Sequence, residues 1–383
     1  MQKVLIVFGT RPEAIKMAPI VLKMKQLVDV FDVTVCVTAQ HREMLDQVTE
    51  IFGIKPDIDL NIMKAGQGLS ELTSNILTEM AIVLEEAEPD LVLVHGDTTT
   101  TFATALAAFY AGIPVGHVEA GLRTHNLKSP FPEELNRQIV SKISDIHFAP
   151  TSHCKTNLIN EKIQEENIYV TGNSVIDALK WTLKSLEGKE EIRVPIVRKL
   201  SQSLGFNWQE EKFILITGHR RENFGEGFLQ ICNALAELSD KHPDTHFVYP
   251  VHLNPNVQKP VHEILGGLQN VHLISPLDYL SFALLLNSCY FVLTDSGGLQ
   301  EEAPSLGKPL LLMRDTTERP EALEAGTIAL VGPDKNRIVQ GVNSLISDQS
   351  LYTTMSNSMN PYGNGDAVDQ IIESIIQHFN LAT

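Results

Sequence analysis

The sequence predicts an α/β protein of two doubly wound parallel-sheet, Rossmann-like domains that face one another across a cleft. Its 383 residues exceed one ordinary hydrophobic core, and the usual domain size of roughly 100 to 200 residues makes two domains the expected number. Short apolar runs alternate with segments of helical spacing along the chain, which indicates parallel sheets covered by helices. Between the two halves, residues 177–211 are charged and contain no good strand, as expected of a hinge.

The first half is expected to contain six strands, because short apolar runs recur there. They lie at residues 4–8, 33–38, 91–95, 114–118, 145–149 and 168–171. Helices are expected after the turn at residues 9–13, at 39–52, 71–86 and 98–110, from 133 onward, and at 152–160. Pro19 predicts a kink or a break in the first helix. Residues 55–68 show no periodicity and indicate a mobile connection.

The second half repeats this alternation. Strands are expected at residues 213–217, 246–251, 271–274, 291–294 and 308–313, and helices at 228–241 and 299–306. Residues 360–365 interrupt the pattern before a last amphipathic helix at 367–379. We therefore predict an N-terminal domain of residues 1–175, onto which the C-terminal helix of residues 366–383 packs back, and a C-terminal domain of residues 176–365.

Composition excludes several classes of function. The formal net charge of -17 argues against nucleic acid or an anionic membrane surface as a partner, because both attract basic proteins. The four cysteines lie far apart without metal-site spacing, and we expect buried, reduced thiols. Nothing approaches the roughly 18 apolar residues of a membrane helix, and the short start before the first strand does not suit a signal peptide. We expect a cytoplasmic protein.

Polar residues follow the expected strands of the first half at their carboxyl ends, where ligands bind in open parallel sheets. Arg11 and Lys16 belong to the turn and helix after the first strand, and Asp97 and Glu119 follow the third and fourth strands. Glu133 opens a helix, where an acidic residue also serves simply to complement the helix dipole. Two strand ends therefore carry carboxylates, which indicates chemistry rather than capping.

The second half offers a phosphate site at a strand end. Residues 296–298, Ser-Gly-Gly, form a turn before a helix, whose unpaired first N–H groups and dipole favour an anion. A plain turn explains the same residues, because a short glycine motif is a weak signal. His219 lies in another strand-end turn and suits either a core position or acid catalysis, and the two arginines that follow it favour a phosphate contact.

Together these groups suit a nucleotide-bound sugar. Arg11, Lys16 and the helix start after Gly298 supply positive potential for a diphosphate. Unpaired carboxylates near a diphosphate weaken simple binding, so their presence indicates proton transfer. The chain lacks the GxSxG nucleophile motif, clustered metal ligands and the GxGxxG fingerprint of nicotinamide binding. We therefore expect neither a cofactor nor a metal.

Several segments carry a resemblance to a known family. They are GTRPEAIKMAP (9–19), TAQHREMLDQV (38–48), HGDTTTT (95–101), GHVEAGLRT (116–124), PEELNRQ (132–138), GHRREN (218–223), YPVHLNPNV (249–257), and DSGGLQEEAPSLGKP with RDTTERPE (295–321). Over essentially its whole length the sequence closely resembles the bacterial non-hydrolysing UDP-N-acetylglucosamine 2-epimerases. The resemblance implies the glycosyltransferase-B fold and interconversion of UDP-N-acetylglucosamine and UDP-N-acetylmannosamine, which supplies surface polysaccharide synthesis.

The family reaction needs at least two acid/base groups. It is an anti elimination of UDP to 2-acetamidoglucal, followed by syn re-addition with the proton delivered to the opposite face of the ring. Carried over position by position, the resemblance implies four catalytic residues: Asp97, Glu119, Glu133 and His219. We expect the carboxylates to transfer protons and His219, with Arg11, to stabilise departing UDP. Which carboxylate serves which face stays open.

The resemblance also implies substrate contacts. Ser296, Gly297 and Gly298 would hold the phosphates and Glu302 the ribose. Phe282 would lie near the uracil, although it suits a core position equally well. The remaining implied contacts are Lys16 near the diphosphate and, near the sugar, Arg137 and Arg314.

Regulation and rival functions complete the expectations. Some members bind a second UDP-N-acetylglucosamine as an activator, and four residues here lie in the segments that form that site: Gln40, Glu134, Arg220 and His252. A hydrolysing relative that releases free N-acetylmannosamine, a glycosyltransferase and a non-enzymatic UDP-sugar sensor are the rival functions. For the quaternary state we expect a homodimer.

Overall fold

The computed structural model describes residues 1–39, 42–62 and 66–382, without the side chains of residues 42–44. The chain divides into two compact units. The first unit consists of Met1–Ala178 with Tyr362–Thr383, and the second unit of Leu179–Pro361. Each unit contains one parallel sheet. The predicted fold class, α/β with two doubly wound parallel sheets, is therefore confirmed.

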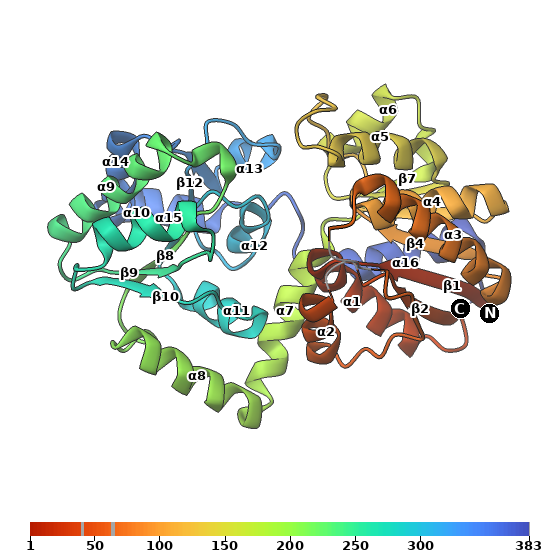
Figure 1. The fold of residues 1–383 in the computed structure, drawn as a ribbon, viewed down its shortest axis with the longest axis horizontal. Coiled ribbons are helices and arrows are strands. Elements are labelled where there is room, and N and C mark those ends of the chain that lie inside the picture. Colours follow the sequence, from red (N-terminus) through yellow and green to blue (C-terminus); the bar gives the residue numbers. More distant parts are fainter. Residues whose placement is uncertain (40–41, 63–65, 383) are drawn as a thin grey trace. The chain divides into compact units, whose positions relative to one another are not determined.

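The first unit contains a sheet in the order β3-β2-β1-β4-β5-β6-β7, with parallel pairing throughout (Figure 1). Its strands are β1 (Gln2–Phe8), β2 (Phe31–Val37), β3 (Ile58–Asp59), β4 (Leu91–His95), β5 (Val115–Val118), β6 (Ile146–Ala149) and β7 (Ile168–Val170). Strand β4, Leu-Val-Leu-Val-His, is buried along its whole length. Such continuous apolar runs are typical of parallel strands covered on both faces. The strand order reverses between β1 and β4.

Helices cover the first sheet. They are α1 (Arg11–Gln26), α2 (Arg42–Ile51), α3 (Leu69–Ala87), α4 (Thr99–Ala111), α5 (Glu133–Ile143), α6 (Ser152–Asn160), η1 (Glu165–Asn167), the start of α7 (Ser174–Glu187) and α16 (Ala367–His378). Helix α1 continues through Pro19, so the broken helix that the sequence allowed there is wrong. The short strand β3 lies within residues 55–68, which the sequence analysis left without structure. It pairs with the end of β2.

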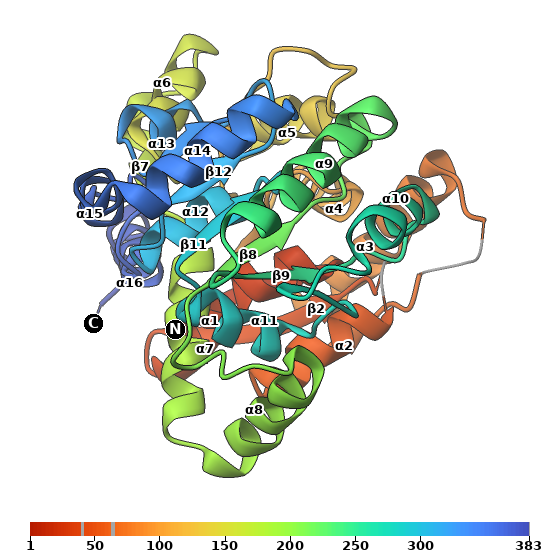
Figure 2. The same cartoon turned by 90° about the vertical axis from the view of Figure 1, so that its left-hand side faces the viewer.

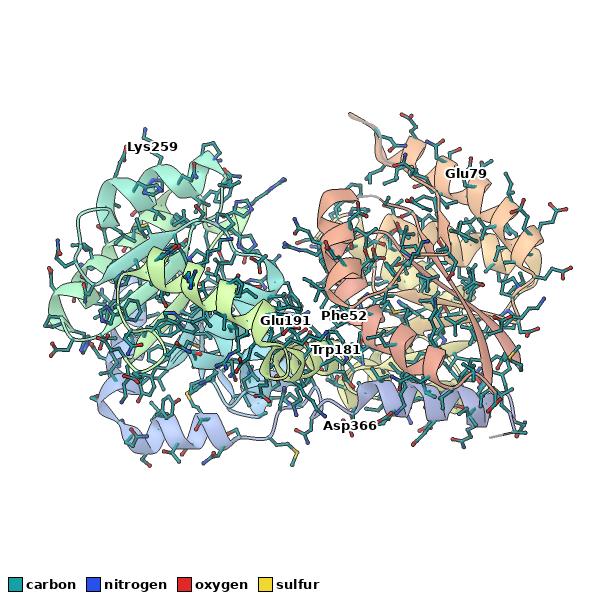
Figure 3. All side chains as sticks on the ribbon, turned by 90° about the horizontal axis from the view of Figure 1, so that it is seen from below. Phe52, Glu79, Trp181, Glu191, Lys259 and Asp366 are labelled. Carbon is teal, nitrogen blue, oxygen red and sulfur yellow. The ribbon has the colours of Figure 1, made fainter. Side chains whose placement is uncertain are left out.

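The C-terminal helix belongs to the first unit. It begins after Asp366, labelled in Figure 3, and contacts α1. Lys23 Nζ lies 2.7 Å from Asp369 Oδ1, and the Val368 N–H donates to Asp177 Oδ1 at 3.1 Å. The last helix is thus held by an ion pair to α1 and by a carboxylate of α7.

The second unit repeats the strand order of the first, as β10-β9-β8-β11-β12-β13, again with parallel pairing. The reversal here lies between β8 and β11. The strands are β8 (Phe213–Thr217), β9 (His246–Pro250), β10 (Val271–Ile274), β11 (Phe291–Thr294), β12 (Leu310–Leu312) and β13 (Ile328–Leu330). The helices are α8 (Glu190–Leu204), η2 (Arg221–Asn223), α9 (Glu226–Lys241), α10 (Pro255–Leu265), α11 (Tyr279–Ser288), α12 (Leu299–Ser305), α13 (Pro320–Glu324), α14 (Lys335–Ser347) and α15 (Gln349–Asn357).

The core of the second unit joins the sheet to the helices on its face. Helices α9 and α14 pack side by side, as Figure 2 shows, and their apolar residues share one buried cluster with β8, β9 and β11. The sequence analysis did not assign β13, α10, α13, α14 or α15. It had expected the strand at 291–294, which is β11, and the helix at 152–160, which is α6; both are confirmed.

All four cysteines are buried thiols, as predicted. Burial raises the pKa of the Cys36, Cys232 and Cys289 thiols to about 12. These groups therefore stay protonated near neutral pH and act as small apolar side chains. Among the described residues, no helix combines the length and apolar character needed to cross a membrane.

Substituting Gly121 by alanine is expected to destabilise the first unit. Gly121 has a φ of +93°, and an added Cβ would lie 2.8 Å from the carbonyl carbon of Cys154. The left-handed backbone costs about 1–2 kcal/mol for alanine, and displacing the backbone of α6 adds about 1–3 kcal/mol. Gly112→Ala is the matched control, because its φ is +70° but nothing lies within 4 Å of the added atom.

Urea unfolding followed by circular dichroism measures the two free energies of unfolding. We expect Gly121→Ala to lose more stability than Gly112→Ala. Equal losses would show that the contact with Cys154 carries no cost.

Candidate active site

Several of the predicted site residues follow the strands that flank the strand-order reversal of each sheet. In the first unit, Arg11 and Lys16 belong to α1, directly after β1, and Asp97 follows β4. In the second unit, His219 follows β8, and the turn Ser296–Gly298, here called the phosphate turn, follows β11. Ligands of open α/β sheets bind at such reversals, outside the carboxyl ends of the strands. Each unit thus presents a candidate half-site.

Glu119 lies at the centre of a polar cluster in the first unit. It follows β5 with a φ of +63°, a backbone conformation that is strained for residues other than glycine. Residues with such strain are found often at functional sites. Its Oε2 atom pairs with Lys16 Nζ and accepts a hydrogen bond from Asn173 Nδ2 at 2.7 Å. The side chains of Glu119 and Lys16 are only 9% and 12% exposed, so little water screens this ion pair.

Two buried histidines support this region. His95 Nε2 lies 3.8 Å from Glu119 Oε2 and has no hydrogen-bond partner among the described residues. Burial lowers the pKa of His95 to about 4, although Glu119 acts to raise it. A neutral imidazole therefore borders the carboxylate at neutral pH. His117 donates from Nε2 to the Gly96 carbonyl at 2.7 Å, which fixes the turn that presents Asp97.

Asp97 is held by helix α5. Arg137 donates from Nε to Asp97 Oδ2 at 2.8 Å, and Asn136 Nδ2 donates to the Asp97 carbonyl at 2.8 Å. Burial alone would lower the pKa of Arg137, but the carboxylates of Asp97 and Glu134 raise it. Arg137 is therefore charged, and it orients a partly exposed carboxylate at the end of β4.

Glu133 and Glu134 open α5 and have different surroundings. One oxygen of Glu133 is buried without a hydrogen-bond partner among the described residues. Glu134 is fully buried and accepts the N–H groups of Thr124 at 3.0 Å and His125 at 3.1 Å. Burial would raise the pKa of Glu134, but these hydrogen bonds and Arg137 lower it. Glu134 anchors a loop, whereas one oxygen of Glu133 has no such donor among the described residues.

Arg11 is exposed beside a turn that a buried carboxylate holds. Glu13 Oε2 accepts the N–H groups of Gly9 at 3.1 Å and Thr10 at 2.8 Å, and Oε1 accepts from Thr98 Oγ1 at 2.7 Å. Burial raises the pKa of Glu13, and these hydrogen bonds lower it less strongly. Because both N–H groups already donate to Glu13, an anion at this turn would be bound by the Arg11 side chain rather than by the backbone of Gly9 and Thr10.

The phosphate turn of the second unit is crowded by charged side chains. A Cβ added to Gly297 would lie 3.0 Å from Arg220 Nη2 and Glu318 Oε1 and 3.1 Å from Arg319 Nη1. Only glycine fits there without displacing them. Over the described part of the chain, no hydrogen bond is found for the N–H groups of Gly297 and Gly298. Free N–H groups at a helix start suit an oxyanion.

Arg314 belongs to an ion-pair network beside this turn. It donates to Glu222 Oε1 at 2.6 Å and to Glu318 Oε2 at 2.8 Å. Arg319 donates to Glu318 Oε1 at 2.8 Å and to the buried Glu301 Oε1 at 2.5 Å. Burial would raise the pKa of Glu318, but the two arginines lower it to about 2. Two carboxylates bind Arg314 here, and its contact with a sugar stays a prediction.

His219 combines exposure with charged neighbours. Its side chain is 43% exposed, and its ring stacks on that of His252 with centroids 5.3 Å apart. Its Nδ1 atom lies 3.9 Å from Asp295 Oδ1. Burial lowers the pKa of His219 most strongly, Asp295 raises it, and His252 and Arg220 lower it further. The ring is thus partly open to solvent, and its pKa depends on burial and on three charged or titratable neighbours.

The remaining predicted residues lie in different surroundings. Glu302 Oε1 lies 3.7 Å from the position of a Cβ on Gly298, so its carboxylate adjoins the phosphate turn. Phe282 on α11 is partly exposed, whereas Ala283 and the leucines after it are buried. Phe282 is therefore not a core residue like its neighbours. Gln40 lies outside the described residues.

Sequence reasoning missed four polar residues of these half-sites: Glu13, His95, Asn173 and Asp295. Asn173 and Asp295 each follow a strand end, the signal that selected Asp97 and Glu119, and it could have selected them too. Glu13 and His95 lie within expected elements, where a buried polar residue has no distinct pattern. Only the tertiary structure shows what their side chains bind.

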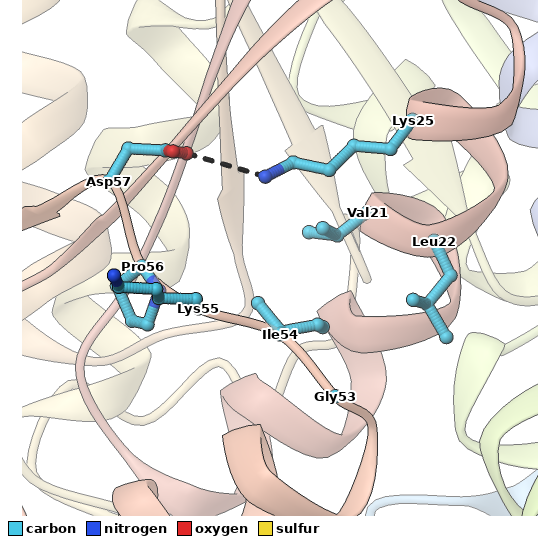
Figure 4. A pocket seen from close by; sticks show the side chains of 8 residues that line it. All are labelled: Val21, Leu22, Lys25, Gly53, Ile54, Lys55, Pro56 and Asp57. Carbon is cyan, nitrogen blue, oxygen red and sulfur yellow. Dashed lines mark hydrogen bonds and ion pairs between the residues drawn. The ribbon is translucent and has the colours of Figure 1, made fainter.

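A surface pocket of about 490 Å³ lies elsewhere in the first unit, between α1 and the segment before β3 (Figure 4). An ion pair between Lys25 Nζ and Asp57 Oδ2, 3.4 Å apart, crosses it. Its lining contains none of the predicted site residues and is formed by Val21, Leu22, Lys25, Gly53, Ile54, Lys55, Pro56 and Asp57. Nothing in this lining resembles the two half-sites.

Known proteins are similar to this chain in both sequence and fold. The family model for UDP-N-acetylglucosamine 2-epimerase matches residues 25–376. The UDP-N-acetylglucosamine 2-epimerase of Yersinia pestis is 56% identical over 98% of this chain and 99% of its own. That of Escherichia coli K12 is 56% identical over 97% of this chain and 98% of its own.

Two solved structures extend the comparison. The UDP-GlcNAc 2-epimerase of Neisseria meningitidis, bound to UDP-GlcNAc, superposes with a TM-score of 0.89 at 53% identity, covering 98% of this chain and 100% of its own. The enzyme of Methanocaldococcus jannaschii, in complex with UDP-GlcNAc and UDP, gives 0.79 at 34% identity, covering 98% and 99%.

Proposed function

Because this chain belongs to the UDP-N-acetylglucosamine 2-epimerase family, we propose that it interconverts UDP-N-acetylglucosamine and UDP-N-acetylmannosamine. The N. meningitidis relative was solved with UDP-GlcNAc bound, and the M. jannaschii relative with UDP-GlcNAc and UDP. We propose further that the reaction takes place in the cytoplasm and supplies N-acetylmannosamine units for surface polysaccharide. The expected homodimer stays a prediction.

The chemistry of the substrate requires loss of UDP. The proton on sugar carbon 2 is not next to a carbonyl and is barely acidic, so it leaves only as the C1–O bond to UDP breaks. An anti elimination then gives 2-acetamidoglucal and UDP. Syn re-addition returns UDP to carbon 1 and places a proton on the opposite face of carbon 2. The site must therefore hold acid/base groups for protons and cations for UDP.

The observation that carries the proposal is the pair of carboxylates after the neighbouring strands β4 and β5, each held by a cation. Asp97 is paired with Arg137, and Glu119 with Lys16 and Asn173. Such partners hold each carboxylate in a defined position, as a proton-transfer group requires. Glu133, with a buried oxygen left over, is the third proposed proton-transfer group.

The second unit is proposed to hold UDP. The free N–H groups of Gly297 and Gly298 suit phosphate oxygens, and Glu302 adjoins the same turn and suits ribose hydroxyls. Ser296 completes the turn, and Phe282 offers a partly exposed ring for the uracil. His219, with Arg11, would stabilise the negative charge that develops on UDP as the bond breaks.

Incubation with UDP-N-acetylglucosamine in deuterium oxide tests the proposal. We expect deuterium at carbon 2 of intact UDP-N-acetylmannosamine and of recovered UDP-N-acetylglucosamine. NMR and mass spectrometry detect the incorporated deuterium. Free N-acetylmannosamine would indicate the hydrolysing reaction instead. Absence of exchange with intact substrate would leave a glycosyltransferase or a UDP-sugar sensor.

Regulation by a second UDP-N-acetylglucosamine is also proposed from the family resemblance. Its residues here would be Gln40, Glu134, Arg220 and His252. His252 stacks on His219, which would link such a site directly to a proposed catalytic group. Normal reverse turnover without added UDP-N-acetylglucosamine, together with a hyperbolic forward progress curve, would exclude this regulation.

A further inference from the structure

Asp295 joins the two loops of the second half-site. It is fully buried, and it lies between the end of β11 and Ser296, the first residue of the phosphate turn. Its Oδ2 atom accepts the N–H groups of His219 at 2.9 Å and Arg220 at 2.8 Å, and the Asn223 side-chain amide at 3.2 Å. Its Oδ1 atom lies 3.2 Å from the same His219 N–H. Every one of these donors comes from the loop after β8.

The hydrogen bonds show that this carboxylate acts as an acceptor on both oxygens. Burying a carboxylate costs free energy unless donors such as these form hydrogen bonds with it. The hydrogen bonds therefore fix the loop after β8 relative to Asp295. The imidazole of His219 adjoins this carboxylate, with Nδ1 3.9 Å from Oδ1. The Nδ1 side of the ring therefore faces Asp295, and the Nε2 side is the one left for a ligand.

We propose that Asp295 is the positioning residue for His219: its carboxylate fixes the position of the imidazole relative to the phosphate turn. The inference rests on the proposed role of His219 in stabilising departing UDP. One buried side chain thus connects the group that binds the diphosphate with the group that meets its developing charge. A break in this connection would impair the chemical step more than substrate binding.

The surroundings of His219 explain why a carboxylate is needed. Partial burial, the stacked His252 ring and the Arg220 guanidinium all lower the pKa of His219, and of these four influences only Asp295 raises it. Without that charge the imidazole would lose its proton at lower pH and donate to UDP less well. A neutral side chain of the same shape would keep part of the geometry but not this effect.

A second carboxylate provides a matched comparison. Glu13 in the first unit is also buried and also accepts two successive backbone N–H groups, those of Gly9 and Thr10. No histidine follows in that turn. Glu13→Gln therefore reports the general cost of neutralising a buried carboxylate that holds a strand-end turn, without the link to His219.

The experiment compares Asp295→Asn with wild type by NMR titration of the His219 ring and by steady-state kinetics. Loss of a charge 3.9 Å from Nδ1 is expected to lower the titration midpoint of His219 by about one pH unit. We expect kcat to fall about 10- to 100-fold with little change in KM, because the reacting groups are misplaced rather than lost. Glu13→Gln is expected to leave the His219 midpoint at its wild-type value.

A double-mutant cycle separates this inference from the proposed function. If Asp295 acts through His219, Asp295→Asn should cost little further activity in a His219→Gln background. Equal losses in both backgrounds, or an unchanged His219 midpoint, would overturn the role of Asp295. Full activity of His219→Gln alone would instead remove His219 from the proposed mechanism.

A measurement on the wild-type protein covers the case in which Asp295→Asn does not fold. The Asn223 side-chain amide and the His219 ring share the Asp295 carboxylate. The Asn223 amide resonance should therefore shift with the same midpoint as the imidazole. An Asn223 resonance that shows no inflection at the His219 midpoint would overturn the connection.

Discussion

Replacing Glu119 with glutamine is expected to lower kcat about 1,000-fold, the usual range for loss of an acid/base group, with a small change in KM. Glutamine keeps the shape of the side chain and can still accept a hydrogen bond from Asn173. It cannot take up a proton from carbon 2 or return one. Deuterium incorporation into substrate should therefore fall in parallel with turnover.

The structure explains why this residue should matter more than an ordinary carboxylate. Glu119 is held in a left-handed backbone conformation, and Lys16 and Asn173 both bind its Oε2 atom. The second oxygen, Oε1, lies near Gly96: it is 3.6 Å from the position that a Cβ on Gly96 would occupy. A strained backbone and a buried lysine thus hold this one carboxylate beside the turn that contains Asp97.

Asp57→Asn is the matched control for this prediction. Asp57 also pairs with a lysine of helix α1, Lys25, but in the pocket of Figure 4, away from the predicted residues. Circular dichroism should show that both variants are folded. Near-normal kcat for Glu119→Gln, with exchange at carbon 2 intact, would remove Glu119 from the proton-transfer groups.

Acid is expected to destabilise the first unit through three buried histidines. Burial lowers the pKa of His95 to about 4 and those of His117 and His147 to about 3, from an ordinary value of 6.5. Below pH 6.5 the unfolded chain binds protons at these rings and the folded unit does not. Stability is therefore complete above that pH and is lost as the pH falls, by about 1.4 kcal/mol per pH unit for each histidine.

Two carboxyl groups of the same unit act in the opposite direction. Burial raises the pKa of Asp177 to about 6 and also raises that of Glu13. At a pH where such a group is protonated in the folded protein but not in the unfolded chain, falling pH favours folding. The three histidines outnumber these two groups, so between pH 6 and pH 5 we expect a net loss of stability. The contribution of one histidine is best measured as a difference between variants.

His147→Gln isolates that contribution. Glutamine does not titrate, and its amide retains a donor for the Ser144 carbonyl that His147 meets. The free energy of unfolding of this variant should fall less steeply with pH than that of wild type, by about 1.4 kcal/mol per pH unit. The same substitution at His153, an exposed residue of the same unit, serves as the control.

Urea unfolding at pH 6 and pH 5 provides the free energies. Both tryptophans, Trp181 (Figure 3) and Trp208, lie in the second unit, so fluorescence follows that unit while circular dichroism follows both. Identical pH slopes for wild type and His147→Gln would show that His147 is protonated in the folded protein.

Much of the fold could be predicted because its signals are local. The run Phe291–Thr294 is apolar without alternation, and it forms the buried strand β11. Strand β3 escaped prediction because two residues carry no periodicity, and it exists only through pairing with Cys36 and Val37. Pro19 was expected to interrupt α1 as one alternative, yet the helix continues and buries Pro19 in its middle. Tertiary packing outweighed the local cost of that residue.

The candidate site was predictable in outline for a similar reason. Strand ends in a parallel sheet share one edge, so Asp97, Glu119 and His219 could be selected from their positions after apolar runs. The cations that pair with the carboxylates could not be assigned in this way. Arg137 binds Asp97 across 40 positions of sequence, and Lys16 binds Glu119 across 103.

The sequence by itself determined the two parallel-sheet units, the family resemblance and the residues at the strand ends, because hydrophobic periodicity and motifs are properties of neighbouring residues. The tertiary structure alone decided which partners hold those residues: Lys16 and Asn173 for Glu119, and Asp295 for the loop of His219. Hydrogen bonds and ion pairs depend on distances of a few ångströms. Such distances between remote parts of a chain are set only when the sheets assemble.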